Sequence, residues 1–267
     1  DVLRYVLCAN APETKDNDFT WKEFQTRNNS ELVGIFGNFI NRAVVLTHKY
    51  FEGKVPSNMK PAEIDAETLA QIPAIKKAIE ENIEHYKFRE ALKDAMNLAR
   101  LGNKYLTDTE PWKVAKEDME RTASILYTSL QICANLAIVL APFLPFSIKK
   151  LNHILNADSL TWDMAGAAEL LTPGHQLNQA ELLFTKVEDS QIDFQMEKLE
   201  ASRQANAAKQ AEAEAKEGKK PIAGKPECTF EEFEKMDIRT AVVLEAERVP
   251  NTDKLLHLKL DTGLDKR

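Results

Sequence analysis

Two polar residues within one apolar helical run have the types and spacing to read a nucleic-acid base. Asn38 and Arg42 stand four residues apart in "GNFINR", which places them on one face of a helix, one turn apart. An amide and a guanidinium both offer planar, paired donors that suit a base edge or a phosphate. On the pattern alone, an exposed polar face with Arg42 paired to an acid on a neighbouring helix is the more common outcome.

An aromatic residue follows a proline in "NKYLTDTEPW". Pro111 suits the first turn of a helix and fixes the backbone ahead of Trp112. A rigidly held ring is a good platform for a base, and such stacking contributes about 1–3 kcal/mol per base. The alternative is a Trp112 packed in the core with its indole N–H bonded. Trp21 and Trp162 have no comparable setting and are interpreted as packing residues.

The residue patterns of common enzymes and metal sites do not occur. The sequence contains no GxGxxG, P-loop, HExxH or GxSxG motif. The acidic pair Asp16 and Asp18 lies in a polar turn, and "EEFE" near Glu231 is typical of a capping turn rather than of a metal site. The sequence therefore indicates a binding function rather than catalysis.

The cysteines are also uninformative as a site. Cys8, Cys133 and Cys228 are far apart, form no CxxC pattern and are odd in number, which suits a reducing compartment. The formal net charge of -7 over 267 residues argues against a protein that coats nucleic acid by charge. It leaves room for a local RNA site built on stacking and hydrogen bonds.

Apolar residues at three- and four-residue steps predict the helices that must position these side chains. We expect one long or gently broken helix over 21–51, a helical hairpin over 65–105, a short helix over 112–116, a long apolar helix over 118–140 and a last helix over 146–155. Short connections make antiparallel neighbours. The predicted fold class is all-α, an antiparallel helical bundle.

Local signals refine these helices. Thr20 and Glu23 have the spacing of a capping box, and Pro73 predicts a kink. The apolar run "LQICANLAIVLAPFLPF" is broken by Pro142 and Pro145 and is short for a bilayer. It therefore predicts a buried helix, and no membrane partner.

The texture changes after the bundle, so we divide the chain by composition. An irregular segment rich in Gly and Pro is expected to fold back on the bundle, an Ala-, Lys- and Glu-rich stretch reads as a helical and then flexible linker, and the end is β-rich, with a turn at 251–254. The expected segments are 1–20, 21–157 (bundle), 158–187 (packed peptide), 188–226 (linker) and 227–267 (β segment). The chain does not begin with Met and its last strand lacks a following partner, so we expect a fragment cut at both ends.

Three motifs in this order carry a family resemblance. "DVLRYVLCANAPETKDNDFTW", "NSELVGIFGNFINR" and "NKYLTDTEPW" resemble the C-terminal part of bacterial methionyl-tRNA synthetases, over about residues 1–187. The end, "TFEEFEKMDIRTAVVLEAERVPNTDKLLHLKLDTG", resembles the start of the tRNA-binding OB-fold appended to many of them. An OB-fold closes with five strands, so only its beginning is present.

The resemblance implies roles for single residues. Trp112 would stack on the first anticodon base, a cytosine, and Asn38 and Arg42 would contact anticodon bases from the facing helix. Four further residues would support that surface: Asn103, Lys104, Tyr105 and Pro111.

The resemblance also implies a parent enzyme. It would attach methionine to initiator and elongator tRNA-Met using ATP, in the cytoplasm, as a possible homodimer through the appended domain. Residues 1–20 would be the connector from its catalytic domain. The HIGH-like and KMSKS-like signatures and the zinc knuckle are absent here, so the chain alone would be inactive, without cofactor, catalytic or metal residues. Two alternatives remain: a free-standing tRNA-binding protein, and a helical protein-interaction module unrelated to RNA.

Overall fold

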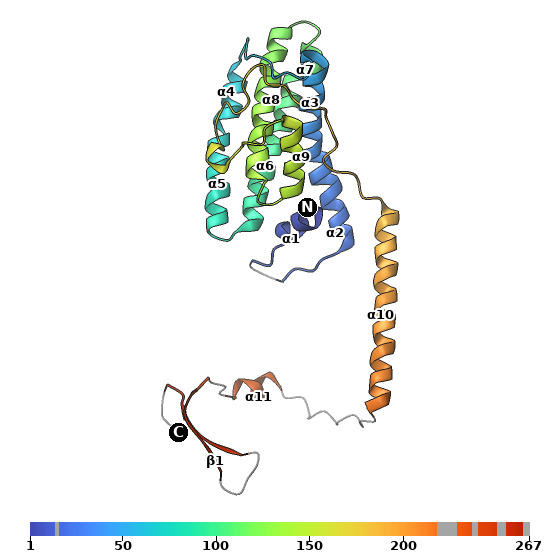
Figure 1. The fold of residues 1–267 in the computed structure, drawn as a ribbon, viewed down its shortest axis with the longest axis vertical. Coiled ribbons are helices and arrows are strands. Elements are labelled where there is room, and N and C mark those ends of the chain that lie inside the picture. The colour runs from blue at the N-terminus through green and yellow to red at the C-terminus, as the bar shows by residue number, and fades with distance from the viewer. Residues whose placement is uncertain (14–15, 218–228, 237–239, 250–254, 264–267) are drawn as a thin grey trace. The chain divides into compact units, whose positions relative to one another are not determined.

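The computed structural model describes residues 1–13, 16–217, 229–236, 240–249 and 255–263. The chain divides into two compact units between Arg203 and Gln204. The first unit is a helical bundle, and the second holds a short helix and a two-stranded antiparallel sheet (Figure 1). A helical bundle followed by a β segment confirms the predicted fold class.

The helices of the first unit and the tether are, in chain order, α1 (Val2–Ala9), α2 (Trp21–Arg27), the π-helix η1 (Asn28–Gly37), α3 (Asn38–Phe51), α4 (Glu63–Ala70), α5 (Ile72–Glu84), α6 (Phe88–Thr109), α7 (Pro111–Val114), α8 (Met119–Val139), α9 (Pro145–Leu155), the 3-10 helix η2 (Trp162–Met164) and α10 (Asp189–Glu217). The second unit adds α11 (Phe230–Glu234), β1 (Val242–Arg248) and β2 (Leu256–Asp261).

Helix starts follow the local signals. The Thr20 hydroxyl accepts the backbone N–H of Glu23 at 3.2 Å, which confirms the cap, whereas the Glu23 carboxylate pairs with Arg27 at 3.1 Å instead of closing the box. Pro73 marks a break rather than a kink. It lies in the first turn of α5, where its missing N–H would have no partner in any case.

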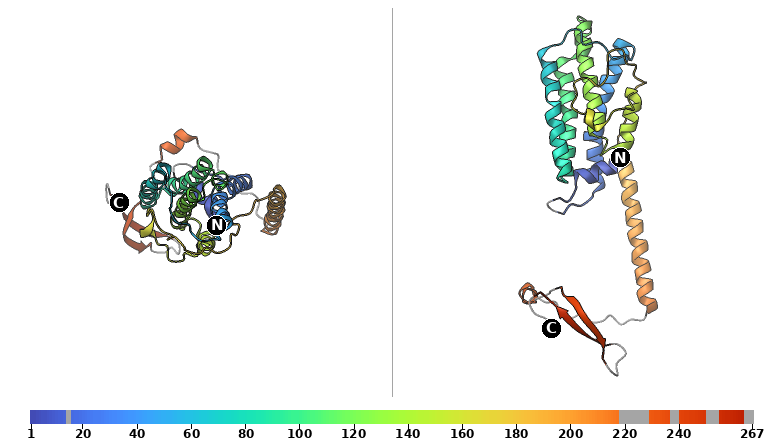
Figure 2. Two further views of the ribbon diagram at one scale, coloured as in Figure 1. Left: turned by 90° about the horizontal axis from the view of Figure 1, so that it is seen from above. Right: turned by 60° about the vertical axis from the view of Figure 1, so that its left-hand side comes forward.

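The long apolar helix α8 forms the centre of the bundle (Figure 2). Every residue from Thr122 to Val139 is buried, and α3, α4, α5, α6, α7 and α9 pack against it. Within the described residues it is the one helix long and apolar enough to cross a membrane. Its apolar window is completely buried inside the protein, which confirms the predicted core helix.

Residues 21–51 form an unbroken helical run whose middle is not α-helical. The sequence predicts α-helix here, but η1 separates α2 from α3. The buried positions Asn28, Leu32, Phe36, Ile40 and Val44 are four residues apart. Four residues of α-helix overshoot a full turn by about 40°, so the wider π-helical turn keeps Asn28, Leu32 and Phe36 facing the core.

The segment 158–188, called the strap from here on, returns along the bundle without regular strands. Buried amides on α8 hold its backbone. The Gln131 carbonyl accepts the N–H of Leu171 at 3.0 Å, and its amino group donates to the Leu171 carbonyl at 2.7 Å. Asn135 accepts the N–H of Gly166 at 2.7 Å. Side chains thus satisfy buried backbone groups that secondary structure leaves unpaired.

The second unit is small. Thr229 and Glu232 close a capping box at the start of α11, which confirms the interpretation of "EEFE". β1 and β2 pair antiparallel, with an irregularity between Val243 and Glu245. The predicted turn at 251–254, the linker residues 218–226 and Cys228 lie outside the described residues. The OB-fold stays a prediction.

Candidate nucleic-acid interface

Trp112 stands at a sharp corner between α6 and α7. Glu110 ends α6 in the left-handed region (φ 42°), and its N–H donates to the Leu106 carbonyl at 3.1 Å. Buried Pro111 then begins α7. The corner carries a half-buried Trp112 on fixed backbone. The ring is therefore not sealed in the core.

Arg42 lies over this ring. Its guanidinium carbon is 4.9 Å from the centroid of the Trp112 ring, which is cation–π geometry. Within the described residues Arg42 has no carboxylate partner, and the Trp112 indole N–H has no hydrogen-bond acceptor. The alternatives of an acid-paired Arg42 and a core Trp112 therefore do not hold for this part of the chain.

One turn before Arg42 on α3, the exposed Asn38 meets Asn103 on α6. The side-chain amino group of Asn38 donates to the side-chain oxygen (Oδ1) of Asn103 at 3.4 Å. Asn103 spends its own amino group on the Ile35 carbonyl at 2.8 Å. The side-chain oxygen of Asn103 is therefore the atom that binds Asn38. Asn38 keeps its own side-chain oxygen and a second N–H for other partners.

Glycine permits this approach of α6 to α3. A Cβ at Gly102 would stand 2.4 Å from the Phe39 ring, closer than any real contact. The missing side chain of Gly102 therefore brings Asn103, the next residue, within reach of Asn38.

Two of the predicted supporting residues point elsewhere. Tyr105 is 2% exposed and donates its hydroxyl to Asp65 at 2.6 Å. Tyr105 therefore lies inside the bundle, and its supporting role stays a prediction. The helical period of the sequence already indicated that Tyr105 is buried, because Tyr105 falls on the inward face of α6 with Gly102 and Leu106. Lys104 is exposed and forms an ion pair with Asp108 one turn on.

Sequence reasoning missed a buried ion pair beneath this corner. Arg121 on α8 grips Asp65 on α4 with two bonds, of 2.5 and 2.7 Å, and Tyr105 adds a third. Burial would raise the pKa of the Asp65 carboxyl. The hydrogen bonds from Arg121, Tyr105 and the Ala62 backbone outweigh it and hold the pKa below its usual value. No local pattern links residues 56 positions apart.

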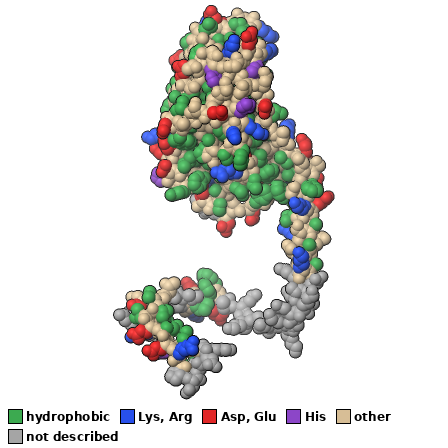
Figure 3. All heavy atoms as spheres, viewed as in Figure 1, with side chains coloured by type: hydrophobic (Ala, Val, Ile, Leu, Met, Phe, Trp, Pro, Cys, Tyr) green, Lys and Arg blue, Asp and Glu red, His purple; other side chains and the backbone are tan. Residues whose placement is uncertain are grey.

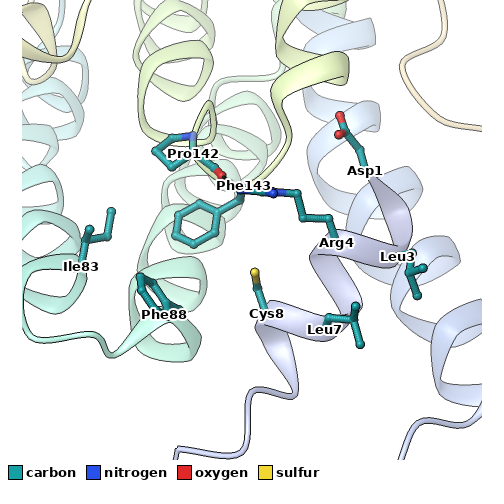
Figure 4. Close-up of a pocket in the computed structure, with 9 residues that line it drawn as sticks. All are labelled: Asp1, Leu3, Arg4, Leu7, Cys8, Ile83, Phe88, Pro142 and Phe143. Carbon is teal, nitrogen blue, oxygen red and sulfur yellow. Dashed lines mark hydrogen bonds between the residues drawn. The ribbon is translucent and has the colours of Figure 1, made fainter.

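A separate hollow of about 710 Å³ lies between α1, the end of α5, the start of α6 and the turn that follows α8. Figure 3 shows hydrophobic side chains gathered near the N-terminus, and Figure 4 shows Arg4 reaching toward Pro142, whose carbonyl it binds at 2.9 Å. Cys8 is its one thiol, and burial raises the pKa of that group. A protonated thiol is a poor nucleophile, so the hollow offers apolar contact rather than catalysis.

Within the described residues no three of His, Cys, Asp and Glu lie close enough to hold a metal ion. The donors needed for a zinc site are therefore not assembled in this part of the chain.

Two family profiles match the chain. The first, "Anticodon binding domain of methionyl tRNA ligase", covers residues 55–204. The second, "tRNA synthetases class I (M)", covers residues 1–44. Together with the helical fold they define the class: the RNA-binding bundle of a class I tRNA synthetase. The chain belongs to the family of anticodon-binding domains of methionyl-tRNA ligases.

Curated relatives agree. The chain is 57% identical over 267 residues to a methionine–tRNA ligase of Phocaeicola vulgatus, and 57% identical over 270 residues to one of Porphyromonas gingivalis. All of the chain is matched in both, but it spans only 38% of each relative.

Solved structures show the same fold. The free Mycobacterium tuberculosis methionyl-tRNA synthetase matches 70% of this chain with a TM-score of 0.64 at 23% identity, over 39% of its own length. The same enzyme in complex with methionyl-adenylate matches 68% of this chain with a TM-score of 0.60 at 25% identity, over 37% of its length.

Proposed function

We propose that this chain reads the CAU anticodon of tRNA-Met as part of a methionyl-tRNA ligase. One observation carries the proposal: Arg42, without an acidic partner in the described residues, stacks on a half-buried Trp112, one turn from the exposed Asn38. Family membership supplies the ligand class.

The geometry suits unstacked bases. An anticodon is single-stranded, and such RNA is read by stacking and by hydrogen bonds to base edges. Trp112, fixed by Pro111, stacks on the first anticodon base. Arg42 and Asn38 supply the paired donors that distinguish bases, and Asn103 orients Asn38 through the contact at 3.4 Å. Lys104 borders this surface, and Tyr105 supports it from inside.

The parent activity follows as a proposal, since the chain spans 38% of its relatives. The parent attaches methionine to initiator and elongator tRNA-Met with ATP, in the cytoplasm. Its ATP, zinc and catalytic residues lie outside this chain, which is inactive alone. We retain the predicted segments at 1–20, 21–157, 158–187, 188–226 and 227–267, and propose the last as a tethered second tRNA module that also dimerises. A tether raises its effective concentration.

The test compares stem-loop RNAs by calorimetry with the 267-residue chain. We expect a CAU stem-loop to bind about tenfold or more tightly than one with a changed first base, the equivalent of one stacked or bidentate contact. Equal binding to every stem-loop would favour a general tRNA-binding protein. Binding to none would favour a helical module unrelated to RNA.

A further inference from the structure

The π-helix η1 ends at the residue before Asn38. The backbone N–H of Asn38 is shared between the carbonyls of Ile35, three residues earlier, and Val33, five residues earlier. The five-residue spacing of the π-helix thus reaches the first residue of the candidate site. π-helical stretches inside α-helices are rare and gather at functional sites.

The other end of η1 is fixed by the strap. The Asn28 amino group donates to the Thr185 carbonyl at 2.9 Å. Asn29 donates to the Val187 carbonyl at 2.9 Å and accepts the Val187 N–H at 2.8 Å. These bonds determine which way the start of η1 faces, because both amides must point at the strap.

The far end carries a separate demand. Asn38 must face Asn103, and Arg42 must face Trp112. Each four-residue step of a plain α-helix turns its side chains by about 40° too far. Over the three steps from Asn28 to Ile40 the error would exceed a quarter turn. Both ends meet their partners because η1 turns less per residue.

Two glycines make room for the wider turn. A Cβ at Gly34 would stand 3.1 Å from the Asn29 carbonyl oxygen, and one at Gly37 would stand 3.0 Å from that of Leu32. Each oxygen belongs to the residue five positions earlier. A methyl group at either position would require the facing carbonyl to move by a few tenths of an ångström, and that movement would change the π-helical geometry.

We propose that η1 sets the rotational phase at which Asn38 faces Asn103 and Arg42 faces Trp112, with Gly34 and Gly37 as positioning residues. The consequence for anticodon reading rests on the proposed function. The phase itself is a property of the free protein and can be measured without RNA.

The test uses Gly37→Ala and Gly34→Ala in the 267-residue chain. Their readouts are the NMR signal of the Trp112 indole N–H, affinity for the CAU stem-loop, and thermal melting. We expect both variants to shift the indole signal and to bind about tenfold more weakly, the equivalent of one lost contact. Thermal melting shows which variants remain folded, so that a shifted indole signal reports a changed rotation rather than unfolding. A merely structural role would instead lower melting and leave the indole signal in place.

Ser30→Ala is the matched control, since Ser30 is exposed within the same segment and gains only helix propensity. It should change neither the indole signal nor affinity. If Gly37→Ala is too unstable to measure, Gly34→Ala decides alone. Unchanged indole signals in the folded glycine variants would overturn the positioning role. Trp112→Ala, measured beside them, separates the two ideas: undiminished CAU binding by that variant refutes the proposed function, while the indole shift still judges η1.

Discussion

Trp112 and Trp162 lie in the same bundle, and each has a cation over its ring, yet their surroundings differ. Lys76 lies 5.9 Å from the Trp162 ring centroid, and Glu80 pairs with Lys76 at 2.7 Å. Glu80 also accepts the Trp162 indole N–H at 3.1 Å. Every polar group of that cluster has a partner.

At Trp112, by contrast, polar groups are left without partners. In the described part of the chain, neither Arg42 nor the Trp112 indole N–H has an anionic or carbonyl partner. A satisfied aromatic–cation cluster is a packing device, whereas an open one has donors left for a ligand. We therefore propose that unpaired polar groups around a ring, rather than the exposure of the ring, distinguish a binding platform from a packing residue.

The largest expected effect tests the support beneath Trp112. Asp65→Asn removes the buried charge that balances the half-buried Arg121, and breaking a fully buried pair costs about 3–5 kcal/mol, which is an upper bound here. We expect a loss of up to that size in the free energy of unfolding, measured by urea titration. Glu67→Gln, exposed on the same helix, is the control. An equal loss of unfolding free energy in both variants would show that the Asp65–Arg121 pair does not stabilise the bundle.

The same carboxyl predicts a pH dependence. Its folded-state pKa is lowered from 3.8, so its stabilisation is complete above that value and is lost as pH falls through the lower folded-state pKa. The free energy of unfolding should therefore fall less steeply on acidification in Asp65→Asn than in the unsubstituted chain. An equally steep fall in both would contradict the assignment.

The second test replaces each of the two tryptophans by alanine in turn. Trp112→Ala should weaken CAU stem-loop binding by about 1–3 kcal/mol, one stacked base, with little change in melting. Trp162→Ala should lower the melting temperature and leave affinity unchanged. Calorimetry and thermal melting of both variants check this. The reverse pattern would make Trp162 the platform.

A third test sharpens the role of Arg42. Arg42→Lys keeps the charge but loses the planar fork. We expect discrimination between CAU and altered stem-loops to fall by about 1 kcal/mol, while affinity for the altered ones stays nearly constant. A uniform loss for all stem-loops would assign Arg42 to phosphate contact.

The smallest effect concerns the closed cluster. Glu80→Gln removes the charge opposite Lys76, and an exposed ion pair contributes little. A slight drop in melting temperature and unchanged RNA affinity are expected. A clear loss of CAU binding would show that the two clusters are not independent.

The sequence predicted the bundle and the position of Asn38 and Arg42 on one helix face, because helical periodicity acts over a few residues. Burial of Tyr105 was also within reach, since it shares the inward face of α6 with Leu106. The cation–π contact between Arg42 and Trp112 was not, because the two residues lie on different helices.

The π-helix was hidden for another reason. Buried positions four apart fit a drifting α-helix as well as a π-helix, and the hydrogen bonds of Asn28 and Asn29 to the strap join residues that are distant in the sequence. The Asp65–Arg121 pair likewise depends on how α4 docks against α8. Such contacts are tertiary, and no window of sequence contains both partners.

The strap also has a mechanical consequence. α10 begins at Asp189, directly after the residues that Asn29 and Gln25 hold: Gln25 donates to the Val187 carbonyl at 3.1 Å and to Asp189 at 2.9 Å. We therefore expect a pull on α10 to reach these side-chain hydrogen bonds first. In this way they would shield Asn38, Arg42 and Trp112 from a force applied through the tether.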